Sequence, residues 1–152
     1  MDDHSCLILG VGNLLLGDEG VGIHVVHRLQ KMHLPPHVEV IDGGTGGFEL
    51  VSLCRNKKKI IIIDAMLADT QPGSVVRATP QELQLQWKAP LSAHHAGLRE
   101  LLDVLQIQTP TPVISILGIV PAVINQPSME LSPRLLSKLE SILALVLKEV
   151  DQ

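Results

Sequence analysis

Residues Lys59 to Met66 read KIIIIDAM, and this stretch decides the fold class. The isoleucines Ile60 to Ile63 are β-branched, and the run offers no polar residue for a solvent-facing side. It therefore predicts a strand that is covered on both faces, as in a largely parallel sheet. The run closes with Asp64, and an aspartate directly after such a strand is hard to explain by solvation alone.

Strand and helix patterns alternate on both sides of this stretch. Short apolar runs predict further strands at Cys6–Val11, Val38–Ile41, Ser74–Arg77 and Val113–Ile119. Helical spacing of apolar residues predicts a helix after Glu19, a shorter one over Phe48–Asn56, one capped by Ser92, and a last one capped by Ser132 with Pro133 at its first position. This alternation predicts an α/β fold, a three-layer α/β/α sandwich of right-handed units around a mostly parallel, roughly five-stranded twisted sheet.

The composition bounds the class of protein. With 152 residues and 45% apolar content, we expect one domain covering residues 1–152. A net charge of -4 with scattered basic residues argues against nucleic acid as the main partner. The placement of Cys6 and Cys54 favours reduced thiols over a disulfide. Without a signal-like N-terminus, or an apolar run near the roughly 20 residues that span a bilayer, we expect a cytoplasmic protein with no membrane insertion.

The segment Leu9 to Gly22, LGVGNLLLGDEGVG, begins like a nucleotide-binding loop but departs from both common patterns. Leu15 stands where the dinucleotide fingerprint needs its third glycine, and no Gly-Lys-Ser/Thr follows as in a P-loop. Asp18 and Glu19 would also place negative charge where a phosphate would bind. We expect the early glycines to let the chain turn tightly off the strand. Asp18 is expected mainly to cap the following helix.

Acidic residues follow the first three predicted strands. Asp18 and Glu19 come after the first strand, Asp42 ends the second in VIDGGTGG, and Asp64 ends the third. Because ligands of open α/β sheets gather outside the carboxyl ends of the strands, these acids are expected to converge on one rim. Two structural explanations stay open. The first acids would also suit a helix N-terminus, and Asp64 could simply accept hydrogen bonds from loop N–H groups.

The segment SAHHAGL predicts a histidine that faces the sheet. In the helix that Ser92 would cap, His94 lines up with the apolar stripe of Leu98, whereas His95 lines up with Arg99. The positive helix end disfavours an imidazolium and leaves His94 a lone pair for a metal, although a core histidine bonded to a carbonyl remains open. One histidine with carboxylates makes an oxygen and nitrogen donor set for a divalent metal.

These segments together resemble the hydrogenase maturation endopeptidases, which trim the C-terminus of the large subunit of nickel–iron hydrogenases. The shared segments, in order, are GVGNLLLGDEGVG, DGGTGGFEL, IIIIDAM, SAHHAGL and ILGIVP followed by a C-terminal helix. The resemblance covers nearly the whole chain. It implies that Glu19, Asp64 and His94 bind nickel, or a substitute divalent metal, and that Asp42 supports the same catalytic cleft.

The resemblance implies an enzyme of the hydrolase class, a protease that cleaves one peptide bond near the C-terminus of the large-subunit precursor after nickel insertion. The nickel would arrive in the precursor, and a monomer would suit this partner. Two chemical routes stay open. In one, the metal polarises the scissile carbonyl while Glu19 or Asp64 activates water. In the other, the metal-binding residues only recognise nickel, and Asp42 or Asp18 assists the attack, as in an aspartic-type reaction.

Two other functions also remain open at this level. One is a nickel-dependent chaperone that binds the same precursor without cutting it. The other is a different hydrolase on the same fold, using Asp42 and Asp64 as an acid pair. A separate metal site built from His24 and His27, which are three residues apart on a predicted helix, is a weaker alternative.

Overall fold

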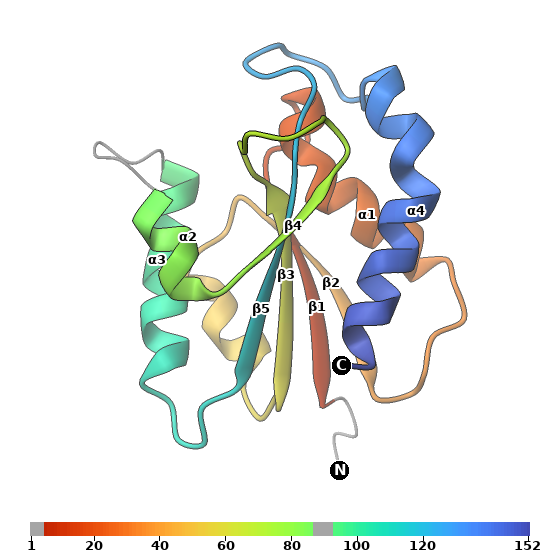
Figure 1. The fold of residues 1–152 in the computed structure, drawn as a ribbon. Coiled ribbons are helices and arrows are strands. Elements are labelled where there is room, and N and C mark those ends of the chain that lie inside the picture. Colours follow the sequence, from red (N-terminus) through yellow and green to blue (C-terminus); the bar gives the residue numbers. More distant parts are fainter. Residues whose placement is uncertain (1–4, 87–92) are drawn as a thin grey trace.

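A computed structural model describes residues 5–86 and 93–152 and shows a five-stranded sheet between two helical layers (Figure 1). The strands are β1 (Cys6–Val11), β2 (Val38–Gly44), β3 (Lys59–Ala65), β4 (Val75–Ala78) and β5 (Val113–Ile119). Their order is β2-β1-β3-β5-β4, and β4 alone runs antiparallel to its neighbour. The predicted fold class is confirmed. The strand that contains the four isoleucines lies at the centre of the sheet.

The helices divide between the two faces of the sheet. On one face lie α1 (Val21–Gln30) and α4 (Pro133–Val150). On the other lie the 3-10 segment η2 (Phe48–Cys54), α2 (Pro80–Gln86) and α3 (Ala93–Gln106). A further 3-10 turn, η1 (Gly17–Gly20), joins β1 to α1. The short helix predicted over Phe48–Asn56 is thus a 3-10 segment.

The helix ends test the predicted caps. Ser132 precedes α4, and its hydroxyl accepts the Leu135 N–H at 3.4 Å, which confirms the predicted N-cap. Ser92, the predicted cap of α3, lies outside the described residues. None of the described helices is long and apolar enough to span a bilayer.

The isoleucine run connects the two halves of the core. Ile61 and Ile63 pack toward α1 and α4, whereas Ile60 and Ile62 pack toward α3, and all of them are fully buried. The alternation follows from the pleat of the strand, in which successive side chains point to opposite faces. Asp64 continues the series of Ile60 and Ile62 and therefore points to the α3 side. The central strand thus delivers its terminal carboxylate to one defined face of the sheet.

The two cysteines lie in different halves of this core. Cys6 packs with the α1 and α4 layer and Cys54 with the α3 layer, and both are buried free thiols. The sheet between them keeps the two sulfur atoms apart. This confirms the prediction of reduced thiols.

Candidate active site

A cavity of about 900 Å³ lies at the carboxyl ends of the parallel strands, on the α3 side of the sheet. Glu19, Asp64, His94 and His95 all contribute to its lining. They come from η1, the end of β3 and the first turn of α3, segments that are far apart in sequence. The expected convergence on one rim is therefore confirmed for Glu19 and Asp64. Asp18 and Asp42 are not part of the lining.

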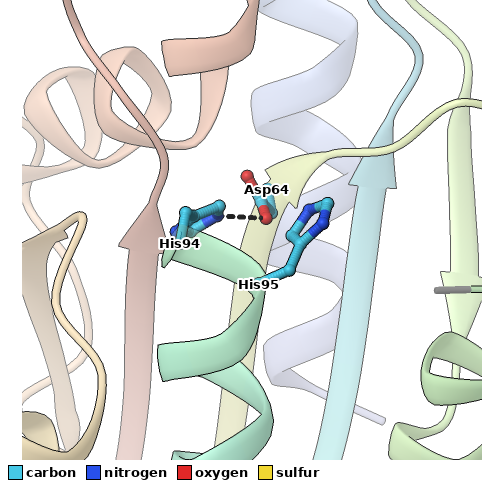
Figure 2. A group of neighbouring side chains, drawn as sticks. All are labelled: Asp64, His94 and His95. Atoms are coloured by element: carbon cyan, nitrogen blue, oxygen red, sulfur yellow. Dashed lines mark hydrogen bonds and ion pairs between the residues drawn. The ribbon is translucent and has the colours of Figure 1, made fainter. Parts of the chain in front are cut away.

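Asp64 is the most enclosed of the acids in the cavity, with 7% of its surface exposed. Its Oδ1 accepts the Ala65 N–H at 2.8 Å, and its Oδ2 lies 2.8 Å from His94 Nε2 (Figure 2). Burial raises the pKa of the Asp64 carboxyl, and the hydrogen bond and charge of His94 offset this only in part. One oxygen thus accepts a backbone N–H, as expected if Asp64 had only a structural role. The other oxygen contacts the imidazole of His94, which that role does not explain.

His94 points toward the sheet as predicted, and its ring reaches the end of β3. The direction of its pKa shift is opposite to the one expected from the helix end. Burial lowers the pKa of His94, but the hydrogen bond to Asp64 and the charges of Asp64 and Glu19 outweigh burial and raise the pKa above its ordinary value. His94 Nδ1 is buried and has no hydrogen-bond partner among the described residues.

His95 lies in the cavity, although its predicted alignment with Arg99 placed it on the outer side of α3. The residue is half-buried, and its ring centroid lies 5.3 Å from that of His94 (Figure 2). Burial lowers the pKa of His95, against the opposing charges of Asp64 and Glu19. The prediction that His95 faces away from the site is therefore wrong, because the first turn of α3 brings both of its histidines to the cavity. At that position both rings can reach the Asp64 carboxylate.

Glu19 lies at the cavity wall formed by η1. Its Oε2 accepts the Asn125 N–H at 2.7 Å. Asn125 has a left-handed backbone with φ of 58°, a conformation that asparagine adopts more readily than most residues. The loop before α4 therefore fixes the Glu19 carboxylate, a contact that links residues more than one hundred positions apart.

Asp18 has a structural role that differs from the predicted one. It is 1% exposed, and its carboxylate accepts the N–H groups of Ala122, Val123 and Ser132 together with the Ser132 hydroxyl. The residue before α1 is Gly20, and α1 has no side-chain cap. The prediction that Asp18 caps the first helix is therefore wrong. Asp18 instead ties the turn after β1 to the loop that leads into α4.

Asp42 lies outside the cavity, on the α1 side of the sheet. Its Oδ2 is 2.8 Å from His27 Nε2, and its Oδ1 accepts the Gly44 N–H at 2.9 Å. Asp42 follows Val38 and Val40 on the same side of β2, and both valines pack in the α1 and α4 layer. The structure therefore does not bring Asp42 to Asp64 as an acid pair. His27 pairs with a carboxylate, and His24 Nε2 is buried without a partner among the described residues.

Glycines allow the segments around the cavity to approach closely. Gly12 has φ of 141°, and a Cβ on it would lie 2.5 Å from the Glu19 carbonyl oxygen and 3.4 Å from Asp64 Oδ1. A Cβ on Gly47 would lie 2.5 Å from the Cα of Gly97, so η2 meets α3 backbone to backbone. Gly97 is one turn from His94 along α3. The glycines of GVGN and DGGTGG thus allow the segments that carry Glu19, Asp64 and His94 to lie close together.

The donor atoms fit a divalent metal. Asp64, His94 and His95 each offer one ligand atom, and these atoms lie within 4.8 Å of one another. Imidazole nitrogen with carboxylate oxygen suits first-row metals such as nickel or zinc. The orphaned Nδ1 of His94 departs from the usual arrangement, in which the second nitrogen of a ligating imidazole is bonded. These three residues could hold a divalent metal ion.

Comparison with known proteins gives the family. The sequence model described as hydrogenase maturation protease matches residues 23–149. The chain belongs to the hydrogenase maturation protease family. It is 33% identical over 144 residues to the hydrogenase 2 maturation protease of Escherichia coli, covering 93% of this chain and 87% of that protein. It is 42% identical over 107 residues to a putative hydrogenase maturation protease of Methanocaldococcus jannaschii, covering 69% and 70% of the two chains.

Solved structures of this family share the fold. The hydrogenase maturating endopeptidase HybD from Escherichia coli superposes with a TM-score of 0.82 at 32% identity, covering 96% of this chain and 91% of that one. The hydrogenase maturation protease HybD from Thermococcus kodakarensis gives a TM-score of 0.76 at 30% identity, covering 94% and 97%. The chain is accordingly a peptidase of the maturation type, and the predicted enzyme class is confirmed.

Sequence reasoning missed three features of this family member's site. The first is that His95 lines the cavity, which the sequence indicates only in that His95 follows His94 in SAHHAGL. The bond from the Asn125 backbone to Glu19 depends on a loop conformation and has no sequence signal of its own. The close contact of Gly47 with Gly97 is hinted at by the glycine-rich DGGTGG segment, but its partner cannot be identified without the fold.

Proposed function

We propose that this protease removes the C-terminal extension of the nickel–iron hydrogenase large-subunit precursor after nickel insertion, and that it acts as a monomer. Glu19, Asp64 and His94 recognise the nickel that the precursor carries. The observation that carries the proposal is the Asp64–His94 contact of 2.8 Å inside the cavity of a hydrogenase maturation protease. This contact brings a carboxylate and an imidazole together in the lining of the cavity.

The cavity has the size and lining for an extended peptide. Its volume of about 900 Å³ lies within the range of small-molecule sites. The large apolar side chains of Leu67, Leu85 and Ile124 line it and are 67%, 86% and 42% exposed. Apolar side chains around a few polar groups are typical of binding pockets. A peptide laid across them would cover apolar surface while its metal reaches the acids.

Burial gives the site a preference for a cation. The Asp64 carboxyl is almost fully enclosed, and burial raises its pKa because the charged form loses hydration. A nickel ion in contact would stabilise that charged form again. The interaction energy is therefore realised with a metal-loaded precursor and not with an empty one. This is how the site would report that nickel insertion is complete.

The positions of the acids favour one of the two chemical routes. Asp18 has four hydrogen bonds from the loop before α4, and Asp42 lies outside the cavity, so neither is placed to activate water there. Glu19 and Asp64 both line the cavity. We therefore favour attack by a water molecule that one of these two carboxylates activates, on a carbonyl polarised by the nickel.

Cleavage of matched precursors tests the function. The purified protein is incubated with nickel-loaded and with nickel-free large-subunit precursor, and the intact mass of the large subunit is followed. We expect loss of a C-terminal fragment from the nickel-loaded precursor only. A stable complex without any loss of mass would support a chaperone, and equal cleavage of both precursors would refute nickel recognition.

A second comparison separates the roles of the two carboxylates. Nickel affinity and cleavage rate are measured for Glu19→Gln and for Asp64→Asn. If one variant keeps nickel affinity but loses at least about 100-fold in cleavage rate, its carboxylate activates water and is not needed to hold the nickel. The variant that loses both lacks a metal ligand. Wild-type cleavage by both variants would remove these acids from the mechanism.

A further inference from the structure

The feature that the function above does not use is the second histidine of the cavity. His95 is adjacent to His94 in the first turn of α3, and the two rings are tilted by 41° with centroids 5.3 Å apart. In Figure 2 the two imidazoles flank the Asp64 carboxylate from opposite sides. The resemblance to the family assigned one histidine to the metal. In the structure, two histidines, His94 and His95, have a ring nitrogen near the Asp64 carboxylate.

The distances suit three donors around one ion. Nitrogen and oxygen ligands lie about 2.0 to 2.2 Å from a first-row divalent metal, so neighbouring donors are roughly 3 Å apart and opposite donors roughly 4 Å apart. His94 Nε2 and Asp64 Oδ2 are 2.8 Å apart, and the group formed with His95 lies within 4.8 Å. Shifts of about an ångström would bring all three donors to one ion.

Glu19 of η1 is a further candidate ligand, beyond the group of three residues whose donor atoms lie within 4.8 Å of one another. Glu19 lines the same cavity as the two imidazoles, and its charge acts on both of them. Its Oε2 is held by the Asn125 N–H. A site with two imidazoles and two carboxylates has the mixed nitrogen and oxygen donor set that nickel and copper bind strongly.

We propose that His95 is a nickel ligand of this protease, so that the metal brought by the precursor meets two imidazoles, from His94 and His95, and the carboxylates of Asp64 and Glu19. This inference rests on the proposed function for the origin of the metal, but the site itself belongs to this chain. Its two adjacent rings on one helical turn would hold the ion against the end of β3.

Binding of nickel alone, without any precursor, tests the proposal. Tag-free wild-type protein is titrated with nickel chloride by calorimetry, in parallel with His95→Gln and with His33→Gln. His33 is an exposed histidine far from the cavity and serves as the control. We expect His95→Gln to weaken nickel binding at least about 10-fold, since loss of even an outer-shell partner costs a metal site 10- to 100-fold. His33→Gln should retain wild-type affinity.

A spectroscopic count of imidazoles separates ligation from a structural effect. With copper(II) in place of nickel, pulsed electron paramagnetic resonance should detect two bound imidazoles in the wild type and in His33→Gln, but one in His95→Gln. Circular dichroism confirms that each variant is folded. A single imidazole in the wild type, an unchanged count in His95→Gln, or no metal binding by the wild type would overturn the proposal. Since no precursor is present, these outcomes are independent of whether the chain cleaves one.

Discussion

Two aspartate–histidine pairs at the carboxyl ends of parallel strands have the same contact distance and very different surroundings. On β2, Asp42 lies 2.8 Å from His27, and their side chains are 37% and 44% exposed. On β3, Asp64 lies 2.8 Å from His94, and their side chains are 9% and 18% exposed. The first pair lies on the α1 side of the sheet and the second lines the cavity.

The difference shows that a contact distance does not define a functional pair. Water screens the charges of an exposed pair, so such pairs contribute about 0 to 1 kcal/mol to stability. Enclosure strengthens the electrostatic interaction and disfavours any uncompensated charge. Only the pair on β3 is therefore expected to respond strongly to a cation or to a polarised substrate. Substitutions that affect one pair and spare the other test this expectation.

The largest difference is expected between substitutions of the two histidines, His94 and His27. His94→Ala should lower the rate of precursor cleavage at least about 100-fold, because it removes the imidazole in contact with Asp64. His27→Ala should stay within about twofold of the wild type, as surface substitutions usually do. The measurement is the initial rate of C-terminal fragment release at equal enzyme concentration. Similar losses in the two variants would contradict the distinction between the pairs.

A substitution of Gly47 should disturb the Asp64–His94 pair by moving the backbone of α3. In Gly47→Ala the new Cβ would lie 2.5 Å from the Cα of Gly97, so α3 must move away from η2 and take His94 with it. We expect a loss of about 1 to 3 kcal/mol in the free energy of unfolding, the usual cost of overpacking. Denaturant titration measures it, with the exposed Ser52→Ala in η2 as the control. A stability equal to that of the control would show that the two glycines are not in close contact.

Glu149, near the C-terminus of α4, is a buried acid that is paired with an arginine and lies outside the cavity. Glu149 is 4% exposed, and its carboxylate accepts Arg77 Nε at 2.9 Å. Burial raises the pKa of Glu149, but hydrogen bonds from Ser115 and Arg77 and the charges of Arg77 and Lys59 outweigh it and hold the pKa below its usual value. Glu149→Gln should cost about 1.5 to 3 kcal/mol near neutral pH, as expected for hydrogen bonds to a charged group.

The sign of the pH dependence follows from the lowered pKa. The carboxylate contributes its stability above the unfolded-state pKa of about 4.3 and loses it as the pH falls through the lower folded-state value. The difference in unfolding free energy between wild type and Glu149→Gln should therefore shrink below about pH 4. Urea titrations across the acid range measure this difference. A constant difference throughout the range would mean that the Glu149 charge has no stabilising role.

The smallest effect is expected from the exposed pair itself. His27→Gln should change the free energy of unfolding by less than about 1 kcal/mol, and added salt should reduce even that difference. Denaturant titrations of wild type and variant at low and high ionic strength provide the test. A salt-independent loss well above that size would place Asp42 and His27 among the structural contacts of the core.

Much of the fold and part of the site could be predicted from the sequence. The isoleucines before Asp64 predicted the central strand, and SAHHAGL predicted a histidine directed at the sheet. The strand pattern alone did not rank the acids, because Asp42 and Asp64 both follow predicted strands; only the family resemblance made Asp64 a metal ligand and Asp42 a supporting residue. The pleat decides between them, since Asp42 shares a side with Val40 and Asp64 shares a side with Ile62. The side of the sheet on which the cavity lies depends on how the helices pack against its two faces, and this cannot be read from a single strand.

The remaining errors have a similar origin in tertiary contacts. Asp18 was expected to act locally, as a helix cap, but it bonds a loop more than one hundred residues away. Helical periodicity predicted that His95 lies on the outer side of α3, but both histidines of its first turn line the cavity. Local patterns therefore predicted the elements well. Contacts between distant segments decided what each polar side chain does.

The most direct test of the account compares the two aspartates in one assay. Asp64→Asn and Asp42→Asn are each incubated with nickel-loaded precursor, and the intact mass of the large subunit is followed over time. The account predicts that Asp42→Asn releases the C-terminal extension at nearly the wild-type rate, whereas Asp64→Asn leaves the precursor uncut. Loss of cleavage in Asp42→Asn with retention in Asp64→Asn would contradict it.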